Sequence, residues 1–342
     1  MRYTSYSSRL TATDKAAQQY GWDRLIIGAS EEDRPIVAYQ KNGKGIRAIA
    51  WALMHGNEPT GYEALFSLMG KSSNVHWCLI PVLNPDGAEA FTRENAHGVD
   101  INRDARAQRS KEAKALTEII RLFKPDFAFN LHDQRARFYP KGANVPATFS
   151  LLAPKGHPVK ETDSQVVAQR LLADWSEQLS LNWKGHCARF DDRFYPTAFG
   201  EFIQGMGIPT ITFETGIAPN NWSRSQAAHQ LTDLLTSLEK WHTQHNLPEN
   251  IQTYIDLPFN ASDANEWAIH HTDGVLHLRW KEKVEAGIYR SYWVAEPYHA
   301  SSPTWYVAKV DVPMPTIQEG EEVRHDILQS LGLEAPDLGL KS

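Results

Sequence analysis

The sequence predicts an α/β fold whose mixed, largely parallel central sheet is covered by helices on both faces, followed by a small β-rich C-terminal extension. Short apolar runs alternate with amphipathic stretches over the first two-thirds of the chain. The apolar runs are almost unbroken, which is typical of strands buried on both faces. After about residue 250 the alternation gives way to consecutive runs of strand character. Alternation of strands and helices indicates a sheet with helical crossovers.

Four apolar runs are expected to form the strands of the central sheet. They lie at residues 46–54 (IRAIAWALM), 75–83 (VHWCLIPVL), 126–131 (DFAFNL) and 208–213 (IPTITF). Helices are expected at residues 59–69, 111–123, 164–179 and 226–242. In the second of these, one apolar stripe runs from Ala115 to Phe123, and Pro125 ends the helix.

The C-terminal part has a different pattern. The runs at residues 274–280 and 288–295 flank KEKVEAG and predict a β-hairpin, and residues 304–312 predict a third strand. We therefore expect a larger catalytic domain over residues 1–249 and a β-rich domain or extension over residues 250–342.

The composition is typical of ordinary globular proteins. The 342 residues suffice for one large domain with a buried core, and the net charge of −6 argues against a nucleic-acid-binding protein. No apolar run is long enough for a membrane span, and the N-terminus has no signal-peptide core. We expect a cytoplasmic protein that does not associate with membranes. Its two cysteines, Cys78 and Cys187, are expected to be reduced and buried.

Candidate metal ligands follow two of the predicted strands. The run at 46–54 leads directly into His55-Gly-Asn-Glu58, and the run at 126–131 ends at His132. Ligands bind just beyond the carboxyl ends of strands in open α/β sheets. Imidazole nitrogen and carboxylate oxygen are both suitable ligands for Zn²⁺, and a catalytic zinc site uses three protein ligands and one open position. The alternative for each residue is a polar loop without metal.

Further motifs follow in order. These are Asn-Pro-Asp-Gly at 84–87, Arg93, Gly-Val-Asp-Ile-Asn-Arg at 98–103, and Glu214 at the end of the run at 208–213. Together with His55-x-x-Glu58 and the strand-end His132, this ordered set resembles the zinc carboxypeptidases related to carboxypeptidase A, and within them the bacterial, non-digestive members. The resemblance covers about residues 45–220. The HGNEPTG segment is also similar to the succinylglutamate desuccinylase and aspartoacylase branch.

The resemblance implies one Zn²⁺ per chain, bound by His55, Glu58 and His132. Zinc lowers the pKa of a bound water to about 7. Glu214 matches the family's general base, which accepts the proton of the water and passes it to the leaving amine. The alternative for Glu214 is a helix cap or an ion pair.

The resemblance also implies substrate-binding roles. Arg93 matches the arginine that stabilises the oxyanion, and Asn102 with Arg103 matches the pair that grips the substrate's terminal carboxylate. Asp100 matches a carboxylate that orients His55, although a plain turn residue is the alternative. Tyr195 is a possible counterpart of the family's mobile tyrosine.

The sequence departs from the family at two places. Asp104 follows Arg103 where the family often has asparagine, and this charge could weaken carboxylate capture or suit a substrate with an amine. Asp133-Gln134 follows His132 in place of a small residue. Arg135, Arg137 and Tyr139 could line the substrate pocket or form a solvated loop.

Three functions are compatible with these motifs. The first is a metallocarboxypeptidase that cleaves a peptide or a peptide-like amide bond, such as one in a cell-wall fragment. The second is a deacylase or amidohydrolase acting on a small N-acyl amino acid. The third is a zinc-binding protein without activity that binds a partner through its β-rich tail. The sequence contains no His-Glu-x-x-His and no Gly-x-Ser-x-Gly motif.

Overall fold

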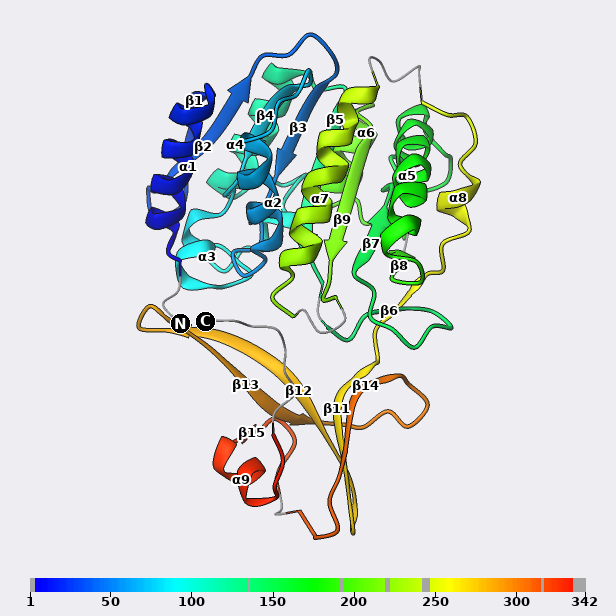
Figure 1. Cartoon of the computed structure of the whole chain (residues 1–342). Coiled ribbons are helices and arrows are strands. Elements are labelled where there is room, and N and C mark those ends of the chain that lie inside the picture. The colour runs from blue at the N-terminus through cyan, green and yellow to red at the C-terminus, as the bar shows by residue number, and fades with distance from the viewer. Residues whose placement is uncertain are drawn as a thin grey trace.

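A computed structural model describes residues 4–134, 136–190, 193–218, 222–241, 247–314 and 317–334. Its centre is an eight-stranded sheet with the strand order β1-β2-β4-β3-β5-β9-β7-β8 (Figure 1). The strands are β1 (Asp23–Ala29), β2 (Pro35–Lys41), β3 (Arg47–Trp51), β4 (His76–Ile80), β5 (Phe127–Asp133), β7 (Phe149–Leu152), β8 (Cys187–Arg189) and β9 (Thr210–Thr215). The strands β4, β3, β5 and β9 are mutually parallel, whereas β1–β2, β2–β4 and β7–β9 pair in antiparallel fashion. The expected mixed, largely parallel sheet is confirmed.

Helices cover both faces of this sheet. The helices α1 (Tyr6–Tyr20), α2 (Thr60–Met69), α5 (Asp163–Asn182) and α7 (Ser225–Ser237) pack on one face, and α4 (Lys111–Phe123) and α6 (Phe199–Gly205) on the other (Figure 1). Successive strand residues alternate between the two cores. Ala48 and Ala50 of β3 face α2, while Ile49 and Trp51 face α4. Shorter helices are α3 (Pro85–Ala90), α8 (Gln252–Ile255), η1 (Ile101–Arg103) and η2 (Leu238–Lys240).

A second sheet follows in the C-terminal part, with the order β14-β11-β12-β13-β15. Its strands are β11 (Asn265–His271), β12 (Gly274–Glu285), β13 (Ile288–Glu296), β14 (Thr304–Lys309) and β15 (Glu322–Val323), and α9 (His325–Ser330) follows. The hairpin is tighter than the sequence suggested, because most of KEKVEAG continues β12. Ala286 and Gly287 alone form its turn, both with positive φ (50° and 74°), as two-residue hairpin turns require.

The smaller sheet packs against the larger unit at the end where β3, β5 and β9 finish (Figure 1). Ile217 and Trp222 of the larger unit belong to the same apolar cluster as Trp267 and Trp293 of the smaller sheet. The indole of Trp305 donates to the carbonyl of Ala136 at 3.0 Å. Within residues 250–342, α8 packs against α5, and β10 (Asn260–Ala261) pairs with β6 (Tyr139–Pro140). The division at residue 250 stays a prediction.

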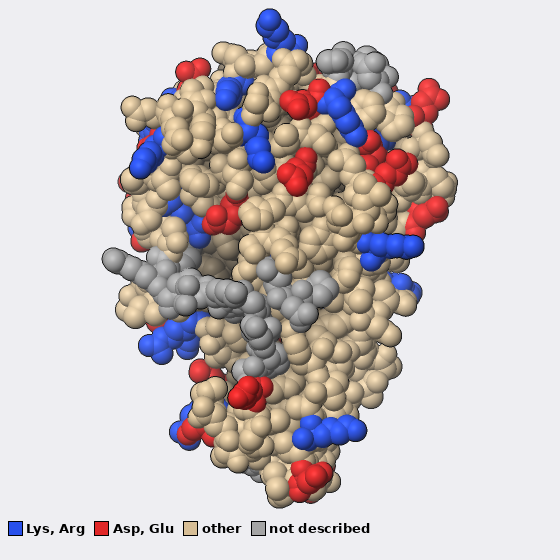
Figure 2. Space-filling model, in the orientation of Figure 1, with Lys and Arg blue, Asp and Glu red and all other residues tan. Residues whose placement is uncertain are grey.

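Cysteine and surface charge agree with the sequence expectations. Cys78 in β4 and Cys187 in β8 are buried, unbridged thiols, and burial raises the pKa of each to about 12. On the face drawn in Figure 2, basic and acidic side chains are interspersed instead of forming one large patch of a single sign. Among the described helices, none has the length and apolar character needed to span a membrane.

Candidate metal centre

Two of the three predicted ligands come from the loop that joins β3 to α2. The backbone of this loop is tightly constrained. Leu53 adopts a left-handed conformation (φ 48°), which is uncommon for a leucine and is typical of functional sites. Gly56 lies so close to the backbone of Gly87 that an added Cβ would be 1.9 Å from its carbonyl carbon. The loop therefore presents His55 and Glu58 in a fixed geometry at the end of β3.

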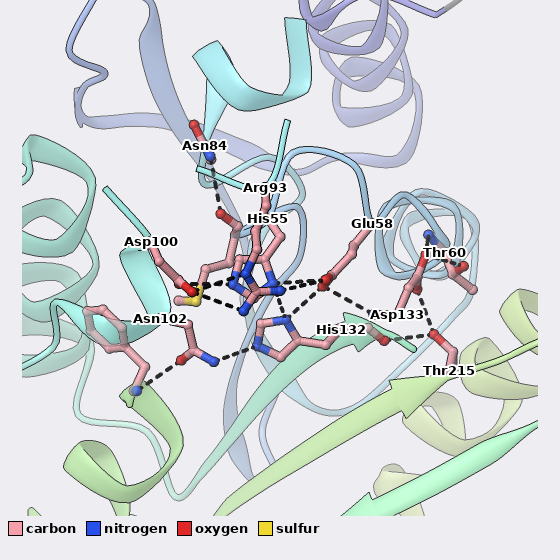
Figure 3. A network of polar contacts seen from close by, with 12 residues as sticks. His55, Glu58, Thr60, Asn84, Arg93, Asp100, Asn102, His132, Asp133 and Thr215 are labelled. Atoms are coloured by element: carbon pink, nitrogen blue, oxygen red, sulfur yellow. Dashed lines mark hydrogen bonds and ion pairs between the residues drawn. The ribbon is translucent and has the colours of Figure 1, made fainter. Parts of the chain in front are cut away.

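The third predicted ligand, His132, lies near the end of β5, the strand beside β3. His55 Nδ1 is 3.1 Å from His132 Nδ1. The Glu58 carboxylate lies 2.9 Å from each of these nitrogens (Figure 3). All three side chains are buried, and their ligand atoms lie within 4.8 Å of one another. The structure thus brings together the three residues that the sequence analysis selected.

The far nitrogen of each histidine ring is also held. His55 Nε2 lies 3.1 Å from Asp100 Oδ1, and His132 Nε2 lies 3.2 Å from Asn102 Nδ2. Asn102 is itself fixed, since its Oδ1 accepts the backbone N–H of Phe199 at 3.0 Å. An Nε2–H that donates to Asp100 leaves the Nδ1 lone pair of His55 facing Glu58 and His132. This arrangement is typical of histidines that bind metals through Nδ1.

The electrostatics of the cluster favour a cation. Burial opposes the charged form of His55, but the charges of Glu58 and Asp100 outweigh it and raise the pKa of His55 to about 9. Burial likewise opposes ionisation of Glu58, yet the two histidines hold its pKa well below the ordinary value. The cluster therefore concentrates negative charge in a buried place, where a bound metal ion would replace the proton of His55 as the counter-charge.

Two further predicted residues lie around this cluster. Arg93 places Nη2 3.0 Å from Asp100 and Nη1 3.4 Å from Glu58. Glu214 on β9 is in register with His132 on β5. Burial and the neighbouring charge of Glu58 raise the pKa of Glu214 to about 8.

Asp133, which follows His132, has a supporting position. Its two carboxylate oxygens accept hydrogen bonds from the hydroxyls of Thr60 and Thr215, each at 2.8 Å (Figure 3). The backbone N–H of Thr60 adds a third bond at 3.2 Å. Asp133 thereby joins the start of α2 to the ends of β5 and β9.

The predicted carboxylate-binding residues form a second group. Arg103 is exposed, and its guanidinium carbon lies 5.8 Å from the ring centroid of Tyr195. Glu201 lies beneath, buried, and accepts the N–H of Tyr195 at 3.4 Å. Burial raises the pKa of Glu201 to about 7.

Asp104 does not act as an open charge beside Arg103. It is fully buried, and its carboxylate accepts the N–H and the hydroxyl of Ser110, both at 2.8 Å. Asp104 thus anchors the residue that caps α4, because the Ser110 hydroxyl also accepts the N–H of Ala113. Its carboxylate is thus directed into the interior, and its expected effect on substrate stays a prediction.

The Asn-Pro-Asp-Gly motif supports the metal loop. Asn84 caps α3 by accepting the N–H of Gly87 at 2.9 Å, and it donates to the carbonyl of Met54 at 3.2 Å. Asp86 accepts from the Ser30 hydroxyl at 2.7 Å. The motif therefore fixes the segment against which Gly56 packs.

A cavity lies beside the cluster. The loop after β5 faces it, as do two residues that the sequence did not single out. Arg137 lines this cavity, together with Asn57 and Arg224. Tyr139 points to the smaller sheet, where its hydroxyl donates to Asp263 at 2.8 Å. Arg135 lies outside the described residues. No sequence pattern marked Arg224, because it follows no strand and belongs to no motif.

Comparison with known proteins gives partial matches. A segment of the chain is 26% identical over 150 residues to a probable carboxypeptidase 2 of Trichophyton verrucosum, covering 38% of this chain and 28% of that protein. Another is 32% identical over 103 residues to the carboxypeptidase SOL1 of Arabidopsis thaliana, covering 23% and 21%. The chain thus spans less than a third of the length of these curated relatives. No family model matches.

Solved structures with the same fold include two bacterial enzymes. A metallo-carboxypeptidase of Pseudomonas aeruginosa, in complex with (2-guanidinoethylmercapto)succinic acid, has a TM-score of 0.56 at 19% identity, covering 70% of this chain and 69% of that one. A metallo-carboxypeptidase of Burkholderia cenocepacia has a TM-score of 0.55 at 16% identity, with coverage of 70% and 69%. The chain therefore has the fold of the metallo-carboxypeptidases. The resemblance drawn from its motifs is confirmed at this level.

Proposed function

We propose that this protein is a zinc-dependent metallocarboxypeptidase that hydrolyses a peptide or peptide-like amide bond with water. The observation that carries the proposal is the buried cluster of His55, Glu58 and His132, whose ligand atoms lie within 4.8 Å of one another. It lies at the carboxyl end of the parallel strands, where α/β enzymes place their chemistry.

The donor set fits zinc. Two imidazole nitrogens and one carboxylate are the three-ligand set that leaves a catalytic zinc ion one open position. The contact of His55 with Asp100 holds the ring of His55 with Nδ1 toward the cluster. Zn²⁺ bound there would acidify water, polarise the carbonyl of the substrate, and lower the pKa of Glu214 through its charge.

The remaining roles belong to the chain's own side chains. Glu214 would accept the proton of the attacking water and deliver it to the nitrogen of the leaving amine. Arg93 would donate to the oxygen of the tetrahedral intermediate. Arg103 would bind the terminal carboxylate of the leaving residue, assisted by Asn102, with Tyr195 closing over it. A cytoplasmic location is part of the proposal, to be tested by cell fractionation.

The test is a comparison of peptides that have a free C-terminus with the same peptides amidated, using zinc-loaded protein. The metallocarboxypeptidase proposal predicts a clear preference for the free acid. Arg103→Ala should reduce kcat/KM on the free acids by about 10-fold or more, because a charge-assisted hydrogen bond typically contributes about 1.5–3 kcal/mol. The amidated peptides should be affected much less.

Metal analysis accompanies the kinetic test. The wild type should hold about one Zn²⁺ per chain, since three ligands form the site, and His132→Ala should lose it. Full zinc occupancy in His132→Ala would reject the ligand set. Equal losses on free and amidated peptides in Arg103→Ala would instead favour the deacylase or amidohydrolase alternative, which small N-acyl amino acids would then test.

A further inference from the structure

A cavity of about 460 Å³ lies between the larger unit and the C-terminal sheet. The larger unit contributes Asn57, Arg137 and Arg224 to its lining, and β12 contributes Arg279 and Lys281. Its volume is in the range of pockets that hold small molecules, which is roughly 300–1,000 Å³. The C-terminal sheet therefore forms one wall of this cavity.

The cavity borders the metal cluster. Asn57 belongs to the metal loop, between His55 and Glu58. Arg224 donates to the carbonyl of Gln134 at 3.4 Å, next to Asp133. In Figure 3, Asp133 and Thr215 lie on one side of His132, and Asp100 and Asn102 on the other. Through Asn57 and Arg224 the cavity is thus connected to the metal loop and to the residues that follow His132.

Polar atoms of the cavity wall lack partners. The side-chain oxygen of Asn57 and Nε of Arg224 are buried without a hydrogen bond among the described residues. The guanidinium of Arg137 likewise makes no hydrogen bond within the described part of the chain. A buried polar group without a partner costs free energy, and a ligand that supplies the partner recovers it. A ligand with at least one hydrogen-bond acceptor for the arginines would therefore supply the missing partners.

The charges of the wall favour an anion. Four cationic side chains, those of Arg137, Arg224, Arg279 and Lys281, line the cavity with two carboxylates, Glu266 and Glu282, and Glu296 pairs with two of the cations, which leaves an excess of one positive charge. Glu282 already accepts the hydroxyl of Tyr289. Arg279 and Lys281 each pair with Glu296 at 2.9 Å. Arg137 and Arg224 form no such ion pair among the described residues, although the charges of Glu282 and Asp133 act on Arg224 from a longer distance. These two arginines are the cations that a ligand can still contact.

Resting on the proposed function, we propose that this cavity receives the acyl side of the substrate and selects a carboxylate there. The acyl side is the part that keeps the carbonyl of the cleaved bond. Arg103 and Tyr195 would take the leaving residue, which leaves the cavity for the acyl part. Arg224 and Arg137 bind its carboxylate, and Asn57 accepts an N–H of its backbone.

Binding of product-like ligands tests this proposal independently of turnover. N-acetyl-glutamate and N-acetyl-glutamine share the carboxylate that hydrolysis creates and differ only in the side-chain acid. Calorimetry with the zinc-loaded full chain, using both enantiomers, should give at least one glutamate enantiomer that binds about tenfold or more tightly than the matching glutamine. Arg224→Gln and Arg137→Gln should each bring this ratio toward one.

Arg290→Gln is the matched control. Arg290 is exposed on β13 and does not line the cavity, and its substitution by glutamine removes the same charge. The ratio of the two affinities in this variant should therefore equal that of the wild type. Near-UV circular dichroism checks folding, and if Arg224→Gln is misfolded, Arg137→Gln decides.

Equal affinity of the two ligands, no binding of either, or a ratio that survives in both arginine variants would overturn the proposal. Peptides with Glu or Gln before the cleaved bond separate the two claims. Turnover of both at equal rates removes the carboxylate preference and keeps the peptidase. Ligand discrimination without any turnover removes the peptidase and keeps the anion site.

Discussion

The two glutamates at the metal cluster have opposite surroundings. Glu58 touches His55 and His132, and both histidines favour its ionised form, so its pKa falls well below the ordinary value. Glu214 is partly buried near the charge of Glu58, and its pKa rises to about 8. Environments that shift the pKa values of two carboxyl groups in opposite directions in this way suit the two groups to different tasks. Glu58 suits a permanent anionic ligand, and Glu214 suits a group that gains and loses a proton.

Glu214→Gln should therefore keep the fold and the metal but lose most turnover. The amide is nearly isosteric, yet it cannot accept the proton of water. General base catalysis contributes about 10²–10⁴ in rate, and Glu214 would act twice, so kcat should fall at or above the top of that range. Metal content and steady-state kinetics measure the two effects. A metal-loaded variant within tenfold of wild-type kcat would show that another group is the base.

Asp100 contacts His55, so we expect a change at Asp100 to alter the affinity for the metal. In Asp100→Asn the amide can no longer accept the Nε2–H of His55 as a charged partner, so the ring loses its orientation and basicity. Loss of such a partner typically weakens metal binding by about 10–100-fold. Competition with a chelator measures this affinity. Asp126→Asn, remote from the cluster at the start of β5, is the control. If Asp100→Asn binds zinc as tightly as the wild type, the role of Asp100 is limited to its contact with Arg93.

At the residue level, the sequence predicted the site well where a residue ends a strand. His55, His132 and Glu214 follow apolar runs, and the sheet places the ends of adjacent parallel strands together. Asp104 shows the limit of this reasoning, because its neighbour in sequence suggested a charge near substrate, whereas Ser110 turns its carboxylate into the interior. Arg224 was not predicted, since its position depends on a long-range contact with Gln134 and on the C-terminal sheet.

At the level of elements, the loop between β3 and α2 depends on one close contact. A Cβ on Gly56 would lie 1.9 Å from Gly87 C and 2.2 Å from Ala88 N, and both are backbone atoms that α3 holds in place. Gly56→Ala should lower the free energy of unfolding by about 1–3 kcal/mol, as overpacking does, and should also weaken metal binding.

Gly70→Ala is the comparison for this prediction. Gly70 caps α2 with φ −82°, and an added Cβ would come no closer than 3.4 Å to another atom. Chemical denaturation with and without zinc measures both variants. If Gly56→Ala is as stable as Gly70→Ala and binds zinc normally, the loop is less constrained than its contacts indicate.

The elements that the sequence predicted have strong local signals. The helix α4 has the expected bounds because Ser110 caps it and Pro125 follows its end. The hairpin β1–β2 was not predicted, since β1 is an edge strand whose first four residues are exposed and whose apolar run is therefore short. The sequence also placed β12 too short, because four of the five residues from Lys281 to Glu285 are charged and this part of the strand is half-exposed.

At the scale of the whole molecule, the two units share an apolar core, and the C-terminal sheet contains a buried acid. Glu266 on β11 is 2% exposed and accepts the backbone N–H of Trp280 at 2.6 Å. Burial raises its pKa to about 7 from an ordinary value of 4.5. The unfolded chain therefore releases this proton near pH 4.5, whereas the folded protein keeps it until about pH 7. The contribution of Glu266 to stability consequently falls as the pH rises from 4.5 to 7 and stays low above that.

Glu266→Gln should remove this pH dependence. The variant should gain stability relative to the wild type as the pH rises, by an amount on the order of 3 kcal/mol between pH 4.5 and 8. Denaturant unfolding across this range measures the difference. Glu319→Gln, with the same charge change at an exposed position of the C-terminal part, should give a constant difference from the wild type. A constant difference for Glu266→Gln as well would contradict the raised pKa.

The two buried thiols make the opening of the central sheet measurable by covalent labelling. Only the thiolate reacts with alkylating reagents, and a pKa of about 12 leaves almost none of it in the native protein at neutral pH. Cys187 lies on β8, the last strand of the sheet, whereas Cys78 lies on β4, between β2 and β3. Fraying of the β8 edge therefore exposes Cys187 alone, and modification of Cys78 requires the middle of the sheet to separate. Mass spectrometry of the two cysteine-containing peptides would measure the rates of these two events separately, in a protein without introduced cysteines.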